Sequence, residues 1–259
     1  MARLGKLGTV LAGAGPSRPC ETAYRVSSGL RRSLAPGRAW RTRRNAGSWT
    51  EECSPELDAR PPLFIVSGPS GAGKGTALDW MVRAGLVRRV PTYTTRPPRP
   101  SERDGVEYNF VTDEDFAKLR EQGQLIEYTR TYSDSYYGSP RELLYSQEPA
   151  ALAAELEPTG YVKVRAMSAR RVIGIFVTTR TEKELRSRLA ERGHIQDAEQ
   201  RLRIRRLQQT WAWVYDYILV NDNRDDFLAE VSTVVQSELI RSRGMRYITE
   251  LQHEESVQP

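Results

Sequence analysis

Residues 64–76 read FIVSGPSGAGKGT, an apolar run that breaks into a glycine-rich turn. Gly68, four further residues and then Gly73-Lys74 give the spacing of a phosphate-binding loop between a strand and a helix. Small residues let backbone N–H groups curl around phosphate oxygens, and the lysine adds a positive charge. The apolar residues 77–82 predict the helix whose N-terminus completes this site. The pattern therefore predicts a nucleoside triphosphate as ligand.

One position departs from the pattern, because Gly75 stands where a Ser or Thr hydroxyl usually binds Mg²⁺. Mg²⁺ keeps several waters in such sites and binds substrate phosphates. We therefore expect Gly75 to remove one protein ligand without abolishing nucleotide binding, and Thr76 is a candidate to replace it. The nucleotide-binding residues predicted from the loop are Gly68, Ser70, Gly71, Ala72, Gly73, Lys74, Gly75 and Thr76.

A second basic motif, TTRPPRPSE at residues 94–102, is followed by DGVEYNF at residues 104–110. Arg96 and Arg99 lie three apart in a proline-rich stretch, which predicts a stiff cationic clamp. Arginine binds phosphate oxygens bidentately, so the clamp suits a second phosphate group. Taken alone, the two arginines would equally suit a solvated basic loop.

Together with Glu127 and the YYGS stretch at residues 136–139, these motifs resemble guanylate kinases, which transfer a phosphoryl group from ATP to GMP. The resemblance covers residues 61–246. It implies that arginine and tyrosine side chains hold the GMP phosphate while Glu127, Ser139 and Thr92 read the guanine edge. A carboxylate accepts from guanine N1–H and N2–H₂ together, and adenine cannot satisfy it. The implied substrate-binding residues are Thr92, Arg96, Arg99, Glu102, Tyr108, Glu127, Tyr137, Ser139 and Glu157.

Residues 155–160 read ELEPTG, where guanylate kinases usually have Asp-x-Asp-x-x-Gly. Alternation along a strand would place the carboxylates of Glu155 and Glu157 on one side. The resemblance implies that Glu157 contacts the guanine or organises Mg²⁺ through water, and that Glu155 supports the metal side. Each Glu is one methylene longer than Asp, and Pro158 stiffens the turn. Two surface glutamates at a strand end are the alternative.

An arginine-rich helix is predicted by EKELRSRLAERG at residues 182–193, which ends at a glycine. Arg188 and Arg192 are four apart and share a face. The resemblance implies a lid over ATP formed by this helix and the next one, which begins at Arg201-Leu202 after a shortened loop. Arg203 is the alternative to Arg201, and a solvated helix with Glu–Arg pairs is the alternative to a lid. The implied catalytic residues are Lys74, Arg188, Arg192 and Arg201, which would neutralise the transferring phosphoryl group.

The last motif, YDYILVND at residues 215–222, is an apolar strand that ends in Asn-Asp. In guanylate kinases the corresponding asparagine lies near the adenine of ATP, so the resemblance implies a nucleotide-binding role for Asn221. A turn cap is the alternative, because Asn and Asp bond their own backbone in turns.

The order of strands and helices around the phosphate loop predicts an α/β fold with a parallel sheet flanked by helices. This is the nucleoside monophosphate kinase type of phosphate-loop fold. We expect a domain at 61–248, with a GMP-binding lobe inserted in its sheet and a short helical lid. The expected segments are a basic extension at 1–60, a core at 61–91, 161–185 and 207–246, a GMP-binding lobe at 92–160, a lid at 186–206 and a polar tail at 249–259.

Charge is concentrated at the N-terminus, where residues 1–50 hold ten Lys or Arg and one acid, Glu21. The rest of the chain is slightly acidic although the whole carries +6, so a specific nucleic-acid site in the folded domain is not expected. The composition of the extension permits a disordered arm, an organelle transit peptide or sequence upstream of the true start. No run approaches the roughly 20 apolar residues of a membrane span. Cys20 and Cys53 form no motif, which fits a reducing cytoplasm.

The sequence thus predicts a cytoplasmic guanylate kinase, monomeric or homodimeric, that uses ATP and Mg²⁺ with GMP or dGMP as acceptor. His194 and His253 are not at ligand spacing, so no metal site built from protein ligands is expected. Two alternatives stay open: a related interaction module that has lost catalysis, and a kinase for another phosphorylated acceptor. Retention of Lys74 and the lid arginines speaks against the first alternative, and the Arg96–Arg99 motif speaks against the second.

Overall fold

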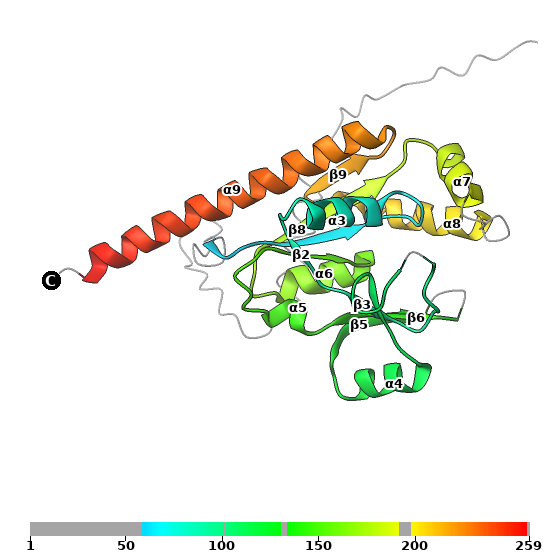
Figure 1. Ribbon diagram of the computed structural model, residues 1–259, viewed down its shortest axis with the longest axis horizontal. Coiled ribbons are helices and arrows are strands. Elements are labelled where there is room, and N and C mark those ends of the chain that lie inside the picture. Colours follow the sequence, from blue (N-terminus) through cyan, green and yellow to red (C-terminus); the bar gives the residue numbers. More distant parts are fainter. Residues whose placement is uncertain (1–58, 101, 131–133, 192–197, 258–259) are drawn as a thin grey trace, which may run out of the picture.

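The computed structural model describes residues 59–100, 102–130, 134–191 and 198–257, whose helices and strands are shown in Figure 1. The basic segment of residues 1–58 lies outside the described residues, and so does Arg192. Within the described part, no helix combines the length and the apolar character needed to cross a bilayer.

The larger sheet has five strands, all paired in parallel, in the order β2-β7-β1-β8-β9. They are β2 (Arg88–Arg89), β7 (Leu152–Glu155), β1 (Leu63–Ser67), β8 (Val172–Thr178) and β9 (Tyr217–Val220). Every residue of β1 and β8 is buried, as expected for central strands with helices on both faces. The predicted α/β class with a parallel sheet is therefore confirmed.

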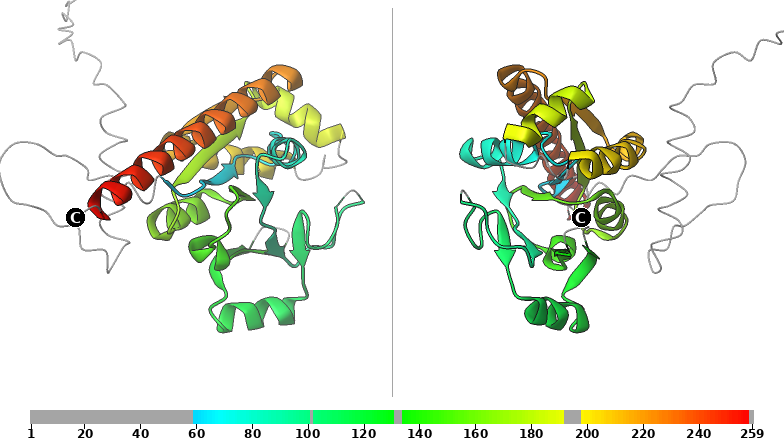
Figure 2. Two further views of the ribbon diagram at one scale, coloured as in Figure 1. Left: turned by 60° about the vertical axis from the view of Figure 1, so that its left-hand side comes forward. Right: turned by 90° about the vertical axis from the view of Figure 1, so that its right-hand side faces the viewer.

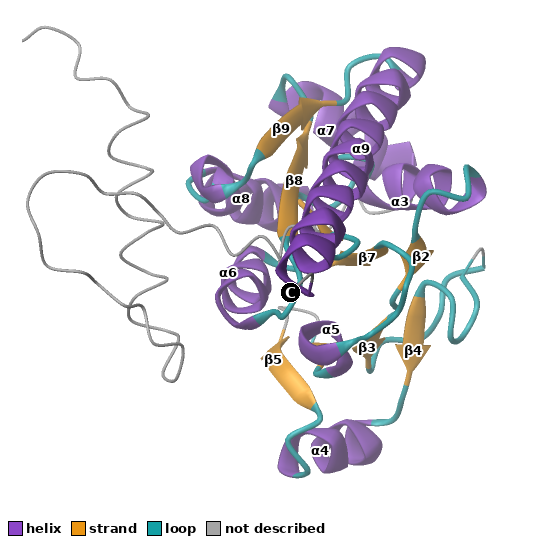
Figure 3. Ribbon diagram, turned by 90° about the vertical axis from the view of Figure 1, so that its left-hand side faces the viewer, coloured by secondary structure: helices purple, strands orange, loops and turns teal. Residues whose placement is uncertain are grey.

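Helices cover both faces of this sheet (Figure 3). One face carries α3 (Lys74–Arg83) and α9 (Arg224–Val257), and the other carries α5 (Glu142–Tyr145) and α6 (Pro158–Met167). Side chains of β1 alternate between the two layers: Phe64 and Val66 pack toward α3 and α9, and Leu63 and Ile65 pack toward α5 and α6. The core is thus two apolar layers separated by the sheet.

A smaller sheet forms a separate lobe below the first one, with the strand order β4-β3-β6-β5 (Figure 2). Its elements are β3 (Thr92–Thr94), β4 (Tyr108–Phe110), α4 (Asp113–Glu121), β5 (Leu125–Arg130) and β6 (Tyr136–Pro140). Strand β3 pairs in parallel with β4 and antiparallel with β6. Thr112 caps α4, since its hydroxyl accepts from the backbone N–H of Asp115.

Two helices, α7 (Glu182–Glu191) and α8 (Ala198–Gln209), contain most of the segment expected as a lid, and a short 3-10 turn, η1 (Ala212–Val214), follows them. Leu185, Leu189 and Leu202 form a small apolar cluster between the two helices. This cluster is separate from the two sheet layers, so the helices pack on each other as a unit.

Three expected boundaries differ from the structure. The lobe, expected at 92–160, ends before β7, because the apolar run of β7 pairs with β1 in the main sheet. The segment expected as a lid, 186–206, starts within α7 and ends within α8, so its bounds do not coincide with the ends of these helices. Residues 249–257, expected as a polar tail, continue α9, because neither Gly nor Pro interrupts this stretch.

A partly exposed polar cluster ties β8 to α6 and to the residue before β9. The carboxylate of Asp216 accepts hydrogen bonds from both Nη groups of Arg165, each at 2.8 Å, and from the backbone N–H of Gly174 at 2.7 Å. Tyr161 stacks on Tyr215 with ring centroids 4.2 Å apart. A Cβ at Gly174 would lie 2.4 Å from the Tyr161 ring, so only glycine lets this ring lie against the sheet.

We expect Gly174→Ala to lower the free energy of unfolding by roughly 1–3 kcal/mol, because the added methyl overpacks the core against Tyr161. Urea unfolding followed by circular dichroism measures the change. Gly244→Ala on the exposed surface of α9, where a Cβ meets nothing within 4 Å, is the matched control. It should keep or raise the stability. Equal stability of Gly174→Ala and the wild type would contradict the packing argument.

Candidate active site

The loop after β1 has the shape that phosphate binding requires. Gly68, Gly71 and Gly73 have φ values of 135°, 87° and 113°, in the left-handed region. A Cβ at Gly68 would lie 2.0 Å from the carbonyl oxygen of Val177, so the close approach of β8 also excludes a side chain there. The loop leads directly into α3, whose N-terminal N–H groups point into the loop.

Lys74 lies across the mouth of this loop. Its Nζ donates to the carbonyl oxygens of Gly68 at 2.7 Å and Pro69 at 3.0 Å. It also lies 3.4 Å from Oε1 of Glu155, the last residue of β7. The ammonium is thus held between the phosphate loop and the carboxyl end of the neighbouring strand.

The side chain of Asn221 holds the backbone of the phosphate loop. Its Nδ2 donates to the carbonyl oxygen of Ala72 at 2.8 Å, and its side chain is packed against Gly73, where a Cβ would lie 2.2 Å from Nδ2. The turn cap considered from the sequence belongs to Asn223 instead, whose Oδ1 accepts from the backbone N–H of Asp225 at 2.8 Å. Asn221 therefore holds the loop backbone in place from the end of β9.

The lid contributes arginines to the same place. Arg201 on α8 donates through Nη1 to Oγ of Ser70 in the loop at 2.9 Å, and Arg188 on α7 donates to the carbonyl oxygen of Asn221 at 2.7 Å. Arg203, the alternative to Arg201, is exposed. The structure thus brings Arg201 and Arg188 to the loop, whereas Arg192 lies outside the described residues.

Two further polar residues of α8 were not identified from the sequence. Arg205 is 4% exposed and donates to the carbonyl oxygen of Thr179 at 2.9 Å, and Gln208 donates through Nε2 to Oε2 of Glu157 at 2.6 Å. With Arg201 they are spaced by four and three residues, so they share one face of the helix. That spacing is the signal that would have identified them.

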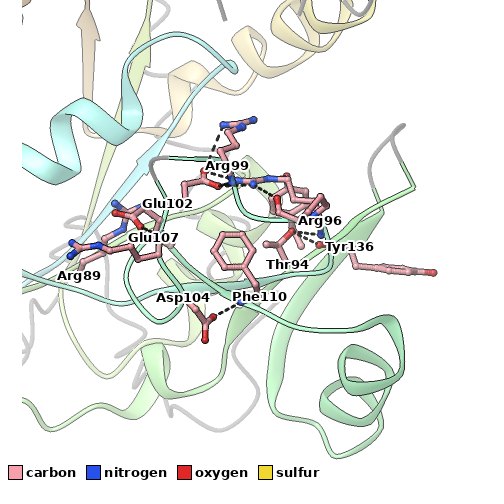
Figure 4. A network of polar contacts seen from close by, with 12 residues as sticks. Arg89, Thr94, Arg96, Arg99, Glu102, Asp104, Glu107, Phe110 and Tyr136 are labelled. Carbon is pink, nitrogen blue, oxygen red and sulfur yellow. Dashed lines mark hydrogen bonds and ion pairs between the residues drawn. The ribbon is translucent and has the colours of Figure 1, made fainter. Parts of the chain in front are cut away.

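A second polar cluster lies in the lobe, around Arg96 (Figure 4). The guanidinium binds Glu102 through both Nη atoms, at 2.6 and 2.7 Å, and donates through Nε to the hydroxyl of Tyr137 at 3.0 Å. It also lies over the rings of Tyr108 and Phe110, at 5.0 and 5.6 Å from their centroids. Burial opposes the charge, but Glu102 and Tyr137 raise the pKa of Arg96 above its ordinary value.

Glu102 is the partner that orients both arginines of the motif. Its Oε2 accepts from the backbone N–H of Arg99 at 2.8 Å, and the Arg99 guanidinium is 3.8 Å from Oε1. A carboxylate only accepts hydrogen bonds when ionised, so Glu102 cannot donate to a phosphate. Arg99, whose side chain is 44% exposed, keeps a guanidinium face open to solvent.

Glu127 and Ser139, for which the resemblance implies contacts to the guanine edge, bond to each other in the lobe. Glu127 on β5 lies directly opposite Ser139 on β6, and Oγ of Ser139 donates to Oε1 of Glu127 at 2.6 Å. Burial raises the pKa of Glu127, while the Ser139 hydrogen bond and the charge of Lys163 oppose this shift. Gly160 allows the approach of α6, because a Cβ there would lie 2.9 Å from Oε1. Thr92, at the start of β3, is also buried.

Glu155 and Glu157 do not lie on one side of a strand, as alternation had suggested. Strand β7 ends at Glu155, and Glu157 is the residue before α6, whose first position is Pro158. The proline starts the helix because its φ suits the first helical turn. The carboxyl group of Glu157 is nevertheless near enough to Lys74, Glu155 and Glu127 to feel their charges. The charge of Glu157 is therefore coupled both to the loop lysine and to Glu127 of the lobe.

Residues 60–238 match the model of a protein family described as guanylate kinase. A guanylate kinase of Synechococcus sp. (strain JA-3-3Ab) is 36% identical over 203 residues, which cover 71% of this chain and 89% of the relative. A guanylate kinase of Wolbachia sp. subsp. Brugia malayi (strain TRS) is 32% identical over 189 residues, covering 71% and 96%. The crystal structure of guanylate kinase from Anaplasma phagocytophilum shares the fold, with a TM-score of 0.54 and 23% identity over 70% of this chain and 86% of that one.

The raised pKa of Glu127 predicts how stability depends on pH. Glu127 holds its proton more tightly in the folded protein than in the unfolded chain. Its ionisation therefore lowers the free energy of unfolding as pH rises from the ordinary pKa of Glu through the raised one. We expect Glu127→Gln to gain stability relative to the wild type between pH 4 and pH 7. Chemical denaturation at both pH values measures the difference, with the exposed Glu121→Gln as control. A difference independent of pH would contradict the prediction.

Proposed function

The chain belongs to the guanylate kinase family, and we propose that it transfers the γ-phosphoryl group of ATP to GMP, giving ADP and GDP. The observation that carries the proposal is the pairing of two phosphate-binding clusters within one domain. One is the loop with Lys74 and Arg201, and the other is the arginine–tyrosine cluster around Arg96. A kinase for a phosphorylated acceptor needs both.

In the donor site, the loop backbone and the N-terminus of α3 bind the β- and γ-phosphates of ATP. Lys74 has three N–H donors, so it can contact phosphate oxygens while retaining a contact with the loop. Arg201 and Arg188 approach from the lid and neutralise charge on the transferring group. Phosphoryl transfer is catalysed mainly by such positioning and charge stabilisation, with no covalent intermediate on the protein.

In the acceptor site, Arg96, Arg99, Tyr108 and Tyr137 bind the phosphate of GMP or dGMP. Burial of the hydroxyl and the charge of Glu155 raise the pKa of Tyr108, so this hydroxyl remains a donor at neutral pH. Glu102 acts indirectly, since it fixes the orientation of Arg96 and Arg99. At the other end, Glu127 accepts from the guanine edge and Ser139 fixes the carboxylate. Adenine would leave this acceptor without a donor, which costs binding energy.

Mg²⁺ would bind among these groups and would balance the charge of the phosphates. Gly75 offers no hydroxyl, and no group of three His, Cys, Asp or Glu side chains that could hold a metal ion occurs among the described residues. Glu155, 3.4 Å from the loop lysine, and Glu157, whose carboxyl group interacts with the charge of that lysine, offer oxygen ligands of the kind that suits Mg²⁺. The residues therefore fit an ion held mainly by phosphates and water.

The family alternatives make different predictions for the full-length chain. An interaction module without catalysis would bind GMP but release no ADP from ATP. A kinase for another phosphorylated acceptor would show no GMP binding. Retention of Lys74 and the contact of Arg201 with Ser70 support catalysis, because both place positive charge where the phosphoryl group is transferred.

We expect ADP release with ATP, Mg²⁺ and GMP, and little release with AMP, CMP or UMP. Lys74→Ala should lower kcat by roughly 10²–10³-fold, because it removes a charge that stabilises the transition state. A coupled ADP assay on the full-length protein measures this. Lys118→Ala on α4, which removes an exposed ammonium paired with Asp115, is the control and should leave the rate unchanged. A Lys74→Ala variant with wild-type kcat would refute the assigned role.

Glu127→Gln should raise the KM for GMP by roughly 10–100-fold, because an amide cannot accept two guanine hydrogen bonds as a carboxylate does. The effect on AMP should be small, so the ratio of kcat/KM between GMP and AMP falls. Steady-state kinetics with both acceptors measure this ratio. An unchanged ratio would show that the base is read elsewhere.

A further inference from the structure

The helix α9 extends well past the part of the chain that matches the family model. The match ends at residue 238, whereas α9 runs from Arg224 to Val257. A helix of 34 residues is about 51 Å long. Its C-terminal half extends beyond the sheet in Figure 1. Residues 239–257 therefore need an explanation that the kinase fold does not supply.

One face of α9 is used by the domain itself. Phe227, Val231, Val235 and Ser242 are buried against the body, and Arg171 from the start of β8 binds Glu238 on the same face. These positions recur every three or four residues, as expected for one side of a helix. The body thus fixes which side of α9 points outward.

The opposite face carries exposed apolar side chains. Ile240, Tyr247 and Leu251 are 58%, 62% and 37% exposed, and Gly244 lies between them. The spacing of four, three and four residues is that of the a and d positions of a coiled coil. At 100° per residue, these four positions lie opposite the buried face. We call them the α9 seam.

Among the described residues, nothing packs against the position of Gly244. A Cβ at this position would meet nothing within 4 Å, yet glycine inside a helix costs about 1 kcal/mol relative to alanine. A glycine on a helix surface is favoured where another large side chain or backbone approaches closely. The seam therefore has a glycine, which leaves space on the helix surface, one turn away from the large exposed side chain of Tyr247.

We propose that the α9 seam binds the α9 seam of a second copy, antiparallel and related by a two-fold axis. In this register Tyr247 of each copy fits over Gly244 of the other, and Ile240 packs against Leu251 of the other. Large and small side chains are thus matched, as core packing requires. A parallel pairing would instead place glycine against glycine and tyrosine against tyrosine.

The charges beside the seam favour the same arrangement. Arg243 and Glu250 are both exposed and occupy equivalent flanking positions of successive heptads. In the antiparallel pair, Arg243 of one copy lies beside Glu250 of the other, and the two-fold axis makes this pair occur twice. The self-complementary pattern of size and charge is the reason for assigning a second copy as the partner. Because the seam faces away from the body, the two domains lie on the outer sides of the paired helices.

The length of the seam limits the strength of the dimer. From Ile240 to Leu251 it spans roughly 16 Å, which is short for an interface of standard size, about 1,600 Å² in total. We expect a dissociation constant on the order of 10 µM, and hence a monomer–dimer equilibrium that shifts with protein concentration.

Sedimentation velocity of the full-length protein between about 1 and 200 µM tests the proposal at low salt. Arg243→Glu should raise the dissociation constant roughly 5–30-fold, because two attractions become two repulsions. The double variant Arg243→Glu/Glu250→Arg should restore it to within about threefold, since the pairs re-form with exchanged charges. Glu230→Arg makes a similar charge change on α9 outside the overlap and should have no effect.

Three results would overturn the proposal. The first is a wild type that remains monomeric at the highest concentration. The second is an Arg243→Glu variant that dimerises as well as the wild type, and the third is a double variant whose dimerisation does not recover. Recovery in the double variant is specific to the antiparallel register, because Arg243 and Glu250 do not meet in a parallel pair. Circular dichroism of each variant confirms that α9 stays helical.

Discussion

The site depends on the hydrogen bond by which Asn221 holds the carbonyl of Ala72. This bond ties the loop after β1 to the end of β9, while Gly68 lies directly against the backbone of β8. Three strands therefore determine the shape of one loop. A loop that must present its N–H groups to phosphate cannot use them for its own folding, so its support has to come from neighbouring elements.

The same edge of the sheet gathers charges of both signs. Lys74 lies between the loop carbonyls and Glu155, and Glu157 feels the charges of Lys74, Glu155 and Glu127. Glu155 lies 3.4 Å from the lysine, and burial raises the pKa of Glu157. The same edge of the sheet also receives Arg188 from α7 and Arg201 from α8. In the proposed reaction these arginines would offset the charge of the bound phosphates.

The lid also touches both halves of the site. On one face of α8, Arg201 contacts the phosphate loop and Gln208 contacts Glu157. A small movement of α8 would therefore alter the phosphate loop and the surroundings of Glu157 together. In the proposed reaction, this shared helix would couple closure over ATP to occupation of the GMP site.

Much of the site could be predicted, because local patterns carry it. The spacing from Gly68 to Lys74 and the two arginines of the second motif indicate phosphate binding by residue type and spacing, whereas the roles of Glu127 and Ser139 came from the resemblance to guanylate kinases. The spacing of Arg205 and Gln208 on α8 could have marked them, but their partners could not be predicted, since Thr179 and Glu157 lie far from them in the sequence. The assignment of β7 to the main sheet also needed the structure, because parallel pairing joins strands far apart in the chain.

The sequence alone determined the ligand class and the α/β fold, because a phosphate loop and its flanking strand and helix are contiguous. Only the tertiary structure decided which arginine of α8 faces the loop, where the lobe ends, and that Glu157 starts a helix rather than extending a strand. It also showed that the α9 seam points outward, because Phe227 and Val231 bury the opposite face of the helix. Contacts between distant segments have no local signature, and these features consist of such contacts.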